Sequence, residues 1–229
     1  TSNRGMVWQD PTWNRPVSRP INHSGTVNGP IVKQKLRYNL SWNVDDNTSD
    51  WYSLLRPRGE LLEQRGISLD SVAMVTAALN GLGVPLSLSA APANAHNQVL
   101  RTTEVLDFAP NATTSIRLSH NGRWQKQVGN NGSETSFPTR VNELSVASHS
   151  FGLRTTSYIK GLLNELTAGF EYYADDQDPY TLLPGGSVRV GTDFSDGRTG
   201  LGSLSFGGGE GDYYENTSNA EIQDEISWL

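Results

Sequence analysis

The stretch IVKQKLRYNLSWNV, residues 31–44, alternates between apolar and polar residues along its length. The apolar set is Val32, Leu36, Tyr38, Leu40, Trp42 and Val44, and only Gln34 breaks it. The residues between them are polar throughout, with positive charges at one end on Lys33, Lys35 and Arg37. A period of two is that of a β-strand with one buried face and one exposed face. The stretch therefore predicts one long strand with a cationic end.

The rest of the chain continues this strand-and-turn character. Strand-like segments lie at 99–108, 114–119, 123–128, 143–153, 165–173, 187–194 and 201–206, separated by Gly, Pro, Asn and Asp clusters. Asn121-Gly122 suits a two-residue hairpin turn between the second and third of them. One helix is predicted over 70–82, where Val72, Val75, Leu79 and Leu82 follow helical spacing and Asp70 can cap the start. Strands without alternating helices predict an all-β antiparallel fold, a jelly roll, β-barrel or sandwich of about eight strands over 31–206.

Composition narrows the chemistry that the chain can perform. The 229 residues include no Cys, which excludes a disulfide framework and a thiol nucleophile. A net charge of −6 makes general nucleic-acid binding a poor hypothesis. Only 4 Lys accompany 14 Arg, a balance typical either of a salt-adapted proteome or of GC-rich coding. No apolar run approaches the ~20 residues that a transmembrane helix needs.

Residues 1–30 read as an extended N-terminal arm. Four prolines at 11, 16, 20 and 30 break any helix there. Trp8 and Trp13 are large apolar side chains that solvent would not stabilise. We therefore expect the arm to dock, either on its own domain or on a neighbouring subunit.

Residues 207–229 read as an acidic tail behind a glycine hinge. The segment GGGEG at 207–211 is flexible by composition, and no positive charge follows Arg198. Ile222, Ile226 and Leu229 fall at i, i+4 and i+7, with Trp228 beside them, which predicts a short helix with one apolar stripe. Such a helix needs a surface to fold against, on its own domain or on another subunit.

No group of residues in the sequence has the pattern of a catalytic site. We therefore predict that the protein is not an enzyme and binds no cofactor and no metal. His23, His96, His120 and His149 are far apart in the sequence. A calcium loop starting at Asp45 would have Asp50 where the EF-hand needs Gly and Arg56 where it needs a bidentate Glu, so that prediction fails, while 174–179 leaves an irregular calcium site open. A glycoside hydrolase needs two nearby carboxylates. Glu165 and Glu171 lie about 20 Å apart on one strand, so Glu143 or Glu104 would have to supply the partner.

Three classes of function remain open at this point. The first is a self-assembling coat protein, whose two termini anchor neighbouring subunits. The second is a carbohydrate-binding β-sandwich that uses exposed Trp and Asn side chains. The third is an enzyme with unmarked carboxylates, which the absence of a catalytic constellation disfavours.

The layout resembles that of viral single jelly-roll capsid proteins. The matching features are the Pro-rich arm with Trp8 and Trp13, the run of strands, the single helix near 70–82 and the Gly-hinged tail. With the acidic balance and few lysines, the chain is most similar to the small major capsid proteins of membrane-containing haloarchaeal icosahedral viruses. The resemblance implies upright β-barrels, self-assembly with a related second coat protein, and location in the virion. It also implies proximity to an internal viral membrane without insertion, and no direct contact with nucleic acid, in keeping with the weakly basic arm.

The predicted contact residues are the anchors of the two termini and the cationic end of the first strand. They are Trp8, Trp13, Lys33, Lys35, Arg37, Ile222, Ile226, Trp228 and Leu229. Two interpretations of the cationic end stay open. Lys33 and Lys35 protect a strand edge from unwanted pairing, or the three cations pair with the acidic segment 210–225 of the same or an adjacent subunit.

Overall fold

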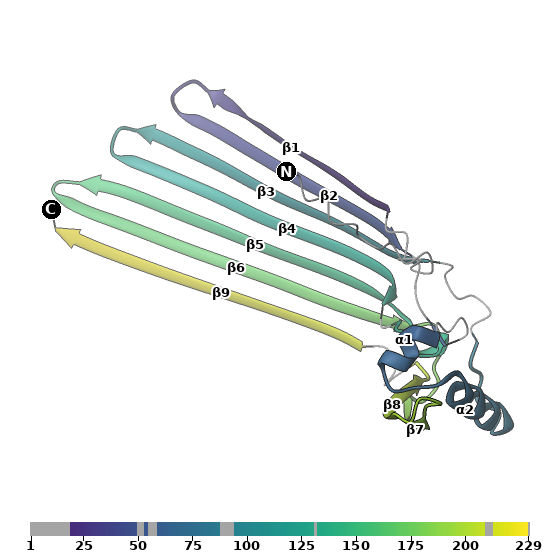
Figure 1. Ribbon diagram of the computed structural model, residues 1–229. Helices are drawn as coiled ribbons and strands as arrows, with labels where there is room; N and C mark the ends of the chain where they lie inside the picture. The colour runs from purple at the N-terminus through teal and green to yellow at the C-terminus, as the bar shows by residue number, and fades with distance from the viewer. Residues whose placement is uncertain are drawn as a thin grey trace, which may run out of the picture.

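The computed structural model describes residues 19–49, 53–54, 59–87, 94–130, 132–208 and 213–228. Most of them form one antiparallel sheet with the strand order β1-β2-β3-β4-β5-β6-β9 (Figure 1). Its strands are β1 (Arg19–Val32), β2 (Leu36–Ser49), β3 (Ala95–Asn111), β4 (Thr114–Asn130), β5 (Asn142–Ile159), β6 (Leu162–Pro179) and β9 (Tyr213–Trp228). At 14 to 18 residues each, these strands are far longer than the usual five or six.

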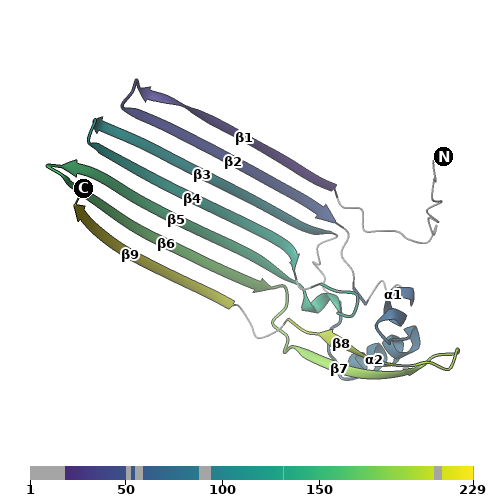
Figure 2. The ribbon, with the colours of Figure 1, turned by 60° about the vertical axis from the view of Figure 1, so that its left-hand side comes forward.

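The connections between the strands differ sharply at the two ends of the sheet. At one end, three tight turns join β1 to β2, β3 to β4 and β5 to β6 (Figure 2). The last of them is the pair Lys160-Gly161, whose two positive φ angles match the twist of a two-residue hairpin. In the β3–β4 turn, the backbone N–H of Thr113 donates to the Asn111 side chain at 2.9 Å. At the other end, only long connections occur.

Those long connections build a small unit that we call the cap. It contains α1 (Gly59–Gln64), α2 (Leu69–Gly81), a 3-10 turn (Pro138–Arg140) and the hairpin of β7 (Gly186–Asp193) with β8 (Thr199–Phe206) (Figure 1). Apolar side chains from all three connections meet in one core: Leu54, Leu62, Ile67, Val72, Leu79, Leu86, Phe137, Val190 and Leu204. Ile67, Phe137 and Leu204 are completely buried. The cap is therefore an ordinary globular core assembled at one end of the sheet.

The predicted helix is confirmed as α2, with a different cap from the one expected. Ser68, rather than Asp70, is the N-cap, and its hydroxyl accepts a hydrogen bond from the Ser71 backbone N–H at 3.1 Å. Asp70 lies in the first turn, where its negative charge favours the helix dipole. The buried residues of α2 are Ser71, Val72 and Leu79.

The all-β antiparallel class is confirmed, and the arrangement of the strands is a meander. The sheet order follows the chain order from β1 to β6, and the described residues form no closed barrel. Two local predictions were wrong. Residues 31–44 are not one strand, because residues 33–35 turn the chain between β1 and β2. Asn121-Gly122 lies inside β4, where both neighbouring strands pair with it, so tertiary pairing overrides its turn propensity.

Both predicted terminal segments contribute strands where the structure describes them. Residues 19–30, expected to belong to the arm, form most of β1 at one edge of the sheet. Pro20 and Pro30 are compatible with this position, because an edge strand has backbone N–H groups that need no partner strand. The predicted C-terminal helix is wrong: residues 213–228 form β9 and pair with β6 along their whole length. Residues 1–18 lie outside the described residues.

Candidate functional site

The two faces of the long sheet differ in chemistry. In the strand register, Leu36, Phe108, Ile116, Thr155 and Leu166 lie side by side in one row across β2 to β6. Every second residue from this row continues the same face, which we call the apolar face. Its large apolar members include Val27, Tyr38, Leu40, Trp42, Val44, Leu100, Leu106, Leu118, Trp124, Phe151, Leu153, Phe170, Tyr172 and Ile222.

The apolar residues of this face form a band of defined height. On β2 the band covers 36–44, on β3 100–108 and on β4 116–124, which is nine residues on each strand. Eight steps of ~3.3 Å give a length of about 26 Å along the strands. Leu118 is 48 % exposed and Phe151 46 %, and within the described part of these seven strands only Val99, on the other face, is a buried hydrophobic residue. Nothing described in this chain covers the band.

Beyond the band, toward the cap, the same face becomes polar. The Asp46 carboxylate lies 2.7 Å from Nε2 of His96 and accepts a hydrogen bond from Gln98 at 3.0 Å. The hydrogen bond from Gln98 is the main cause, and the contact with His96 the second, of a pKa of Asp46 below its usual value. Lys126 pairs with Glu143 at 2.6 Å, and this hydrogen bond raises the pKa of the lysine. The apolar band therefore has a sharp polar border on the cap side.

Polar side chains also occur on the apolar face. At the border of the band near the tight turns, Asn164 donates to the Asp224 carboxylate at 2.7 Å. A larger polar cluster lies inside the band. Nδ1 of His120 is 2.5 Å from the Glu104 carboxylate, and its Nε2 is 3.1 Å from Nδ1 of His149. The His120 ring stacks on Phe151 at 4.4 Å, and Trp124 meets His149 edge-on at 4.9 Å. Glu104, His120 and His149 therefore form a chain of polar contacts within an aromatic surface. Sequence reasoning missed it because the three residues come from three strands, and only the register unites them.

The opposite face, which we call the polar face, carries a ladder of hydrogen bonds and ion pairs. Arg101 pairs with Asp45 at 2.5 Å, Arg117 with Asp107 at 2.7 Å, and Arg154 with Glu165 at 2.9 Å. Between the ion pairs, neutral side chains also bond across strands, as Thr103 does to Asn121 at 3.0 Å.

The two halves of the polar face carry net charges of opposite sign. Strands β2 to β5 present Arg37, Asp45, Arg101, Asp107, Arg117, Arg123 and Arg154. Strands β6 and β9 present only acids, namely Glu165, Glu171, Asp175, Glu215, Glu221 and Glu225. The described part of this face is therefore cationic on one side and anionic on the other.

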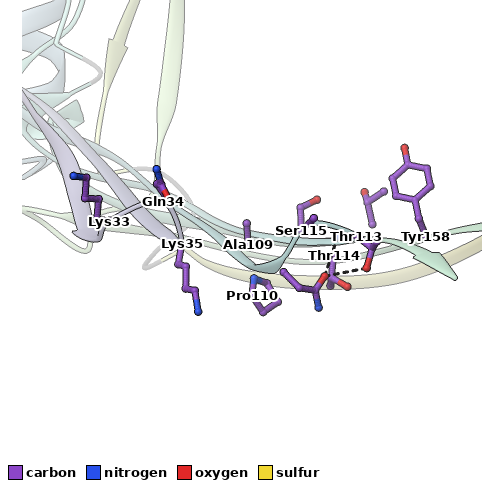
Figure 3. A pocket seen from close by; sticks show the side chains of 12 residues that line it. Lys33, Gln34, Lys35, Ala109, Pro110, Thr113, Thr114, Ser115 and Tyr158 are labelled. Atoms are coloured by element: carbon purple, nitrogen blue, oxygen red, sulfur yellow. Dashed lines mark hydrogen bonds between the residues drawn. The ribbon is translucent and has the colours of Figure 1, made fainter.

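Three pockets are lined by side chains of the polar face. One, of 490 Å³, crosses β3 to β9 at mid-height and is lined by Arg101, Arg123, Glu171 and Tyr173 among others. A second, of 630 Å³, lies near the tight turns beside Arg37, Arg117 and Arg154. The third, of 470 Å³, lies at the turns themselves, where Figure 3 shows Ser115 and Tyr158 on one side and Lys35 on the other.

The structure separates the residues that the sequence grouped as contacts. Lys33 and Lys35 lie in the β1–β2 turn, not along a strand edge, and Arg37 points to the polar face. Ile222, Ile226 and Trp228 lie on the apolar face of the edge strand β9, with 63 % or more of each exposed. Since β9 is at the far edge of the sheet from β2, the cationic turn does not meet residues 213–225, the described part of the acidic segment, within one chain. Trp8, Trp13 and Leu229 lie outside the described residues.

The carboxylate pairs and metal groups considered from the sequence are not formed. Glu104 and Glu143 lie on the apolar face, whereas Glu165 and Glu171 lie on the polar face. Because the sheet separates the two groups, no carboxylate of one can act with a carboxylate of the other on the two sides of a glycosidic bond. Among the described residues, no group of three or more His, Asp or Glu side chains is placed to hold a metal ion. Asp175 and Asp176 of the 174–179 segment point to opposite faces.

No helix in the described part of the chain is long and apolar enough to cross a membrane. Comparisons with models of protein families, with curated proteins and with solved structures find no match to this chain. The two-faced sheet is therefore the feature from which function has to be argued.

Proposed function

We propose that the long sheet is embedded in a lipid bilayer, with its apolar face toward lipid and its polar face toward an aqueous passage. The observation that carries this proposal is the uncovered apolar band on one face of strands whose other face is a polar ladder. An exposed apolar surface of this extent marks a site of contact with a membrane or another protein.

The height of the band favours lipid as the partner. Membrane-spanning strands carry about 9 to 11 residues across the bilayer, with an outward apolar band ~25 Å tall. The nine-residue spans on β2, β3 and β4 match this length. Aromatic side chains such as Trp42, Trp124 and Phe108 contribute to the band, as is common near membrane interfaces.

The asymmetry of the connections supports the same proposal. Membrane-spanning antiparallel sheets have short turns on one side and longer loops on the other. Here all tight turns lie at one end, and the connections that build the cap lie at the other. On the side of the apolar face, Lys35 in the first turn is placed to meet lipid headgroups (Figure 3).

A membrane location also requires a partner for each edge of the sheet. The outer edges of β1 and β9 have no neighbouring strand among the described residues. Unpaired backbone groups cannot be left in hydrocarbon, since each would cost several kcal/mol. The proposal therefore includes closure of both edges by further strands, so that the sheet forms a sector of a closed wall.

Single cysteines test this proposal cleanly, because the chain contains none of its own. Leu118→Cys and Ser119→Cys place one thiol on each face at the same height. After reconstitution into lipid vesicles, a charged maleimide should label the polar-face thiol and spare the apolar-face thiol. Both thiols should react in denaturant, which controls for labelling chemistry. Equal labelling of the two thiols in vesicles, or failure of the protein to float with lipid, would refute the proposal.

The capsid function predicted from the sequence stays a prediction. A shell protein would cover the apolar band with another subunit instead of lipid. In the same experiment, a protein that assembles in lipid-free buffer and protects Leu118→Cys there would favour a capsid over a membrane wall.

A further inference from the structure

The pocket at mid-height on the polar face is lined by one cationic and one anionic side chain that form no ion pair with any described residue. This pocket has a volume of 490 Å³, and Arg123 and Glu171 contribute to its lining. Arg123 donates to the neutral side chain of Gln125 at 2.5 Å and has no carboxylate partner among the described residues. Glu171 has no hydrogen-bond or ion-pair partner within the same part of the chain.

The register explains why Arg123 stays unpaired. Arg123 lies directly opposite Arg101 on the neighbouring strand, and like charges in that position repel. Asp45 neutralises Arg101 at 2.5 Å, which leaves the second guanidinium without a counter-charge. On its other side, Arg123 faces Ser148, which is small and neutral.

Glu171 occupies the corresponding position on the acidic half of the face. Its neighbours in the register are Ser150 on β5 and Asn219 on β9, both neutral. One strand, β5, lies between Arg123 on β4 and Glu171 on β6, and the two residues are offset by two positions along the strands. These spacings put their backbones about 10 Å apart across the strands and about 7 Å along them. The two long side chains shorten that gap, and the small residues between them leave its floor open.

The groups between the two charges are suited to a small polar molecule. Ser148 and Ser150 provide hydroxyls along the floor, and Tyr173 provides an aromatic side wall. The Tyr173 hydroxyl donates a hydrogen bond to the Asp175 carboxylate at 3.3 Å.

We propose that this pocket binds a small zwitterion, of amino-acid or dipeptide size, with its carboxylate on Arg123 and its ammonium group on Glu171. A zwitterion satisfies both charges at once, whereas an anion or a cation leaves one of them unpaired. The proposal goes beyond a passage through the membrane, because it gives the polar face a preferred solute. It does not depend on a bilayer.

Glycylglycine is the probe, titrated into the full chain in neutral detergent micelles and followed by saturation-transfer NMR. Arg123→Gln and Glu171→Gln should each weaken binding about tenfold or more, since each removes a charge-assisted hydrogen bond. Arg117→Gln is the matched control, because that arginine is on the same face and already paired with Asp107. It should leave binding unchanged.

Two further measurements separate recognition of charge from a structural effect. N-acetylglycine lacks the ammonium group, so its weaker binding should respond to Arg123→Gln and not to Glu171→Gln. The double variant Arg123→Glu, Glu171→Arg should bind glycylglycine again, turned end for end. The proposal is overturned if glycylglycine does not bind at tens of millimolar, if neutral N-acetylglycinamide binds equally well, or if Arg117→Gln weakens binding as much as Arg123→Gln. Because no bilayer is present, these outcomes leave the membrane proposal untouched.

Discussion

The cap buries its large apolar side chains, whereas the long sheet leaves its own partly exposed. In the cap, side chains from three distant connections are removed from water, and Ile67 and Leu204 are completely buried. In the sheet, apolar side chains of the same kinds stay near half exposed, such as Leu118 at 48 %. The cap is stabilised by its own packing, whereas the sheet has a hydrophobic face whose partner must come from outside the described residues. This difference in burial is the observation on which the membrane proposal rests.

The largest expected effect comes from removing a large side chain from the cap. Phe137→Ala empties a completely buried position and should cost about 3–5 kcal/mol. Hydrogen exchange measured by mass spectrometry should show the loss in peptides from α2, β7 and β8. Phe151→Ala on the apolar face is the matched control, and in micelles it should change exchange much less. Equal destabilisation by the two variants would contradict the contrast between cap and sheet.

The second-largest effect is expected from a charge placed on the apolar face of the sheet, compared with the same charge on the polar face. In a bilayer, Leu118→Arg should destabilise the folded protein by about 2–4 kcal/mol, because the position lies within the apolar band. Ser119→Arg, its neighbour on the polar face, should be nearly neutral. Urea unfolding in lipid vesicles, followed by tryptophan fluorescence, measures both. A similar tolerance of arginine at the two positions would argue against lipid contact.

A smaller effect tests how closely the cap is packed. A Cβ on Gly202 would collide with the Ile67 side chain and crowd the Arg65 carbonyl, so Gly202→Ala should cost about 1–3 kcal/mol through overpacking. Gly191→Ala has open space around the new methyl group and should be tolerated. Thermal unfolding of the two variants provides the comparison. If Gly191→Ala proves the more damaging change, the packing of the cap is described wrongly.

The smallest effect concerns the polar border of the apolar face. Hydrogen bonds from Gln98 and His96 hold the pKa of Asp46 below 3.8 in the folded protein. This group therefore adds stability above the pKa of the unfolded chain, and the contribution is lost as the pH falls through the lower folded value. Asp46→Asn should remove a small part of the stability difference between pH 6 and pH 3. Unfolding curves at these two pH values check it, with Asp193→Asn on the cap hairpin as the control.

The elements of this fold were largely predictable from the sequence, while their assembly was not. Alternation of apolar and polar residues predicts strands, and the spacing from Val72 to Leu79 predicts α2. The pattern does not show where one strand ends, since the alternation of 31–44 continues through the turn at Gln34, a residue with positive φ. Likewise Ile222 and Ile226 fit both a helical stripe and one face of a strand. Hydrogen bonding to β6 makes this segment a strand and not a helix. That pairing requires the rest of the sheet, so the local sequence could not predict it.

The candidate site was hidden from sequence reasoning for a physical reason. Glu104, His120 and His149 are brought together by the register of three strands, and nothing in their local sequence marks them. The same holds for Arg123 and Glu171. One signal was available: the alternation recurs in strand after strand with little apolar sequence left to cover it. That excess of one-sided strands indicates an external partner for the sheet.

A scan of single cysteines along 116–124 tests the central claim most directly. Each cysteine carries a fluorophore, and the protein is reconstituted in vesicles whose lipid tails carry a quencher. If the apolar face meets lipid, quenching will alternate with a period of two, high at even positions and low at odd ones. Uniform quenching along the strand, or an alternation that persists when the quencher is confined to water, would contradict the account.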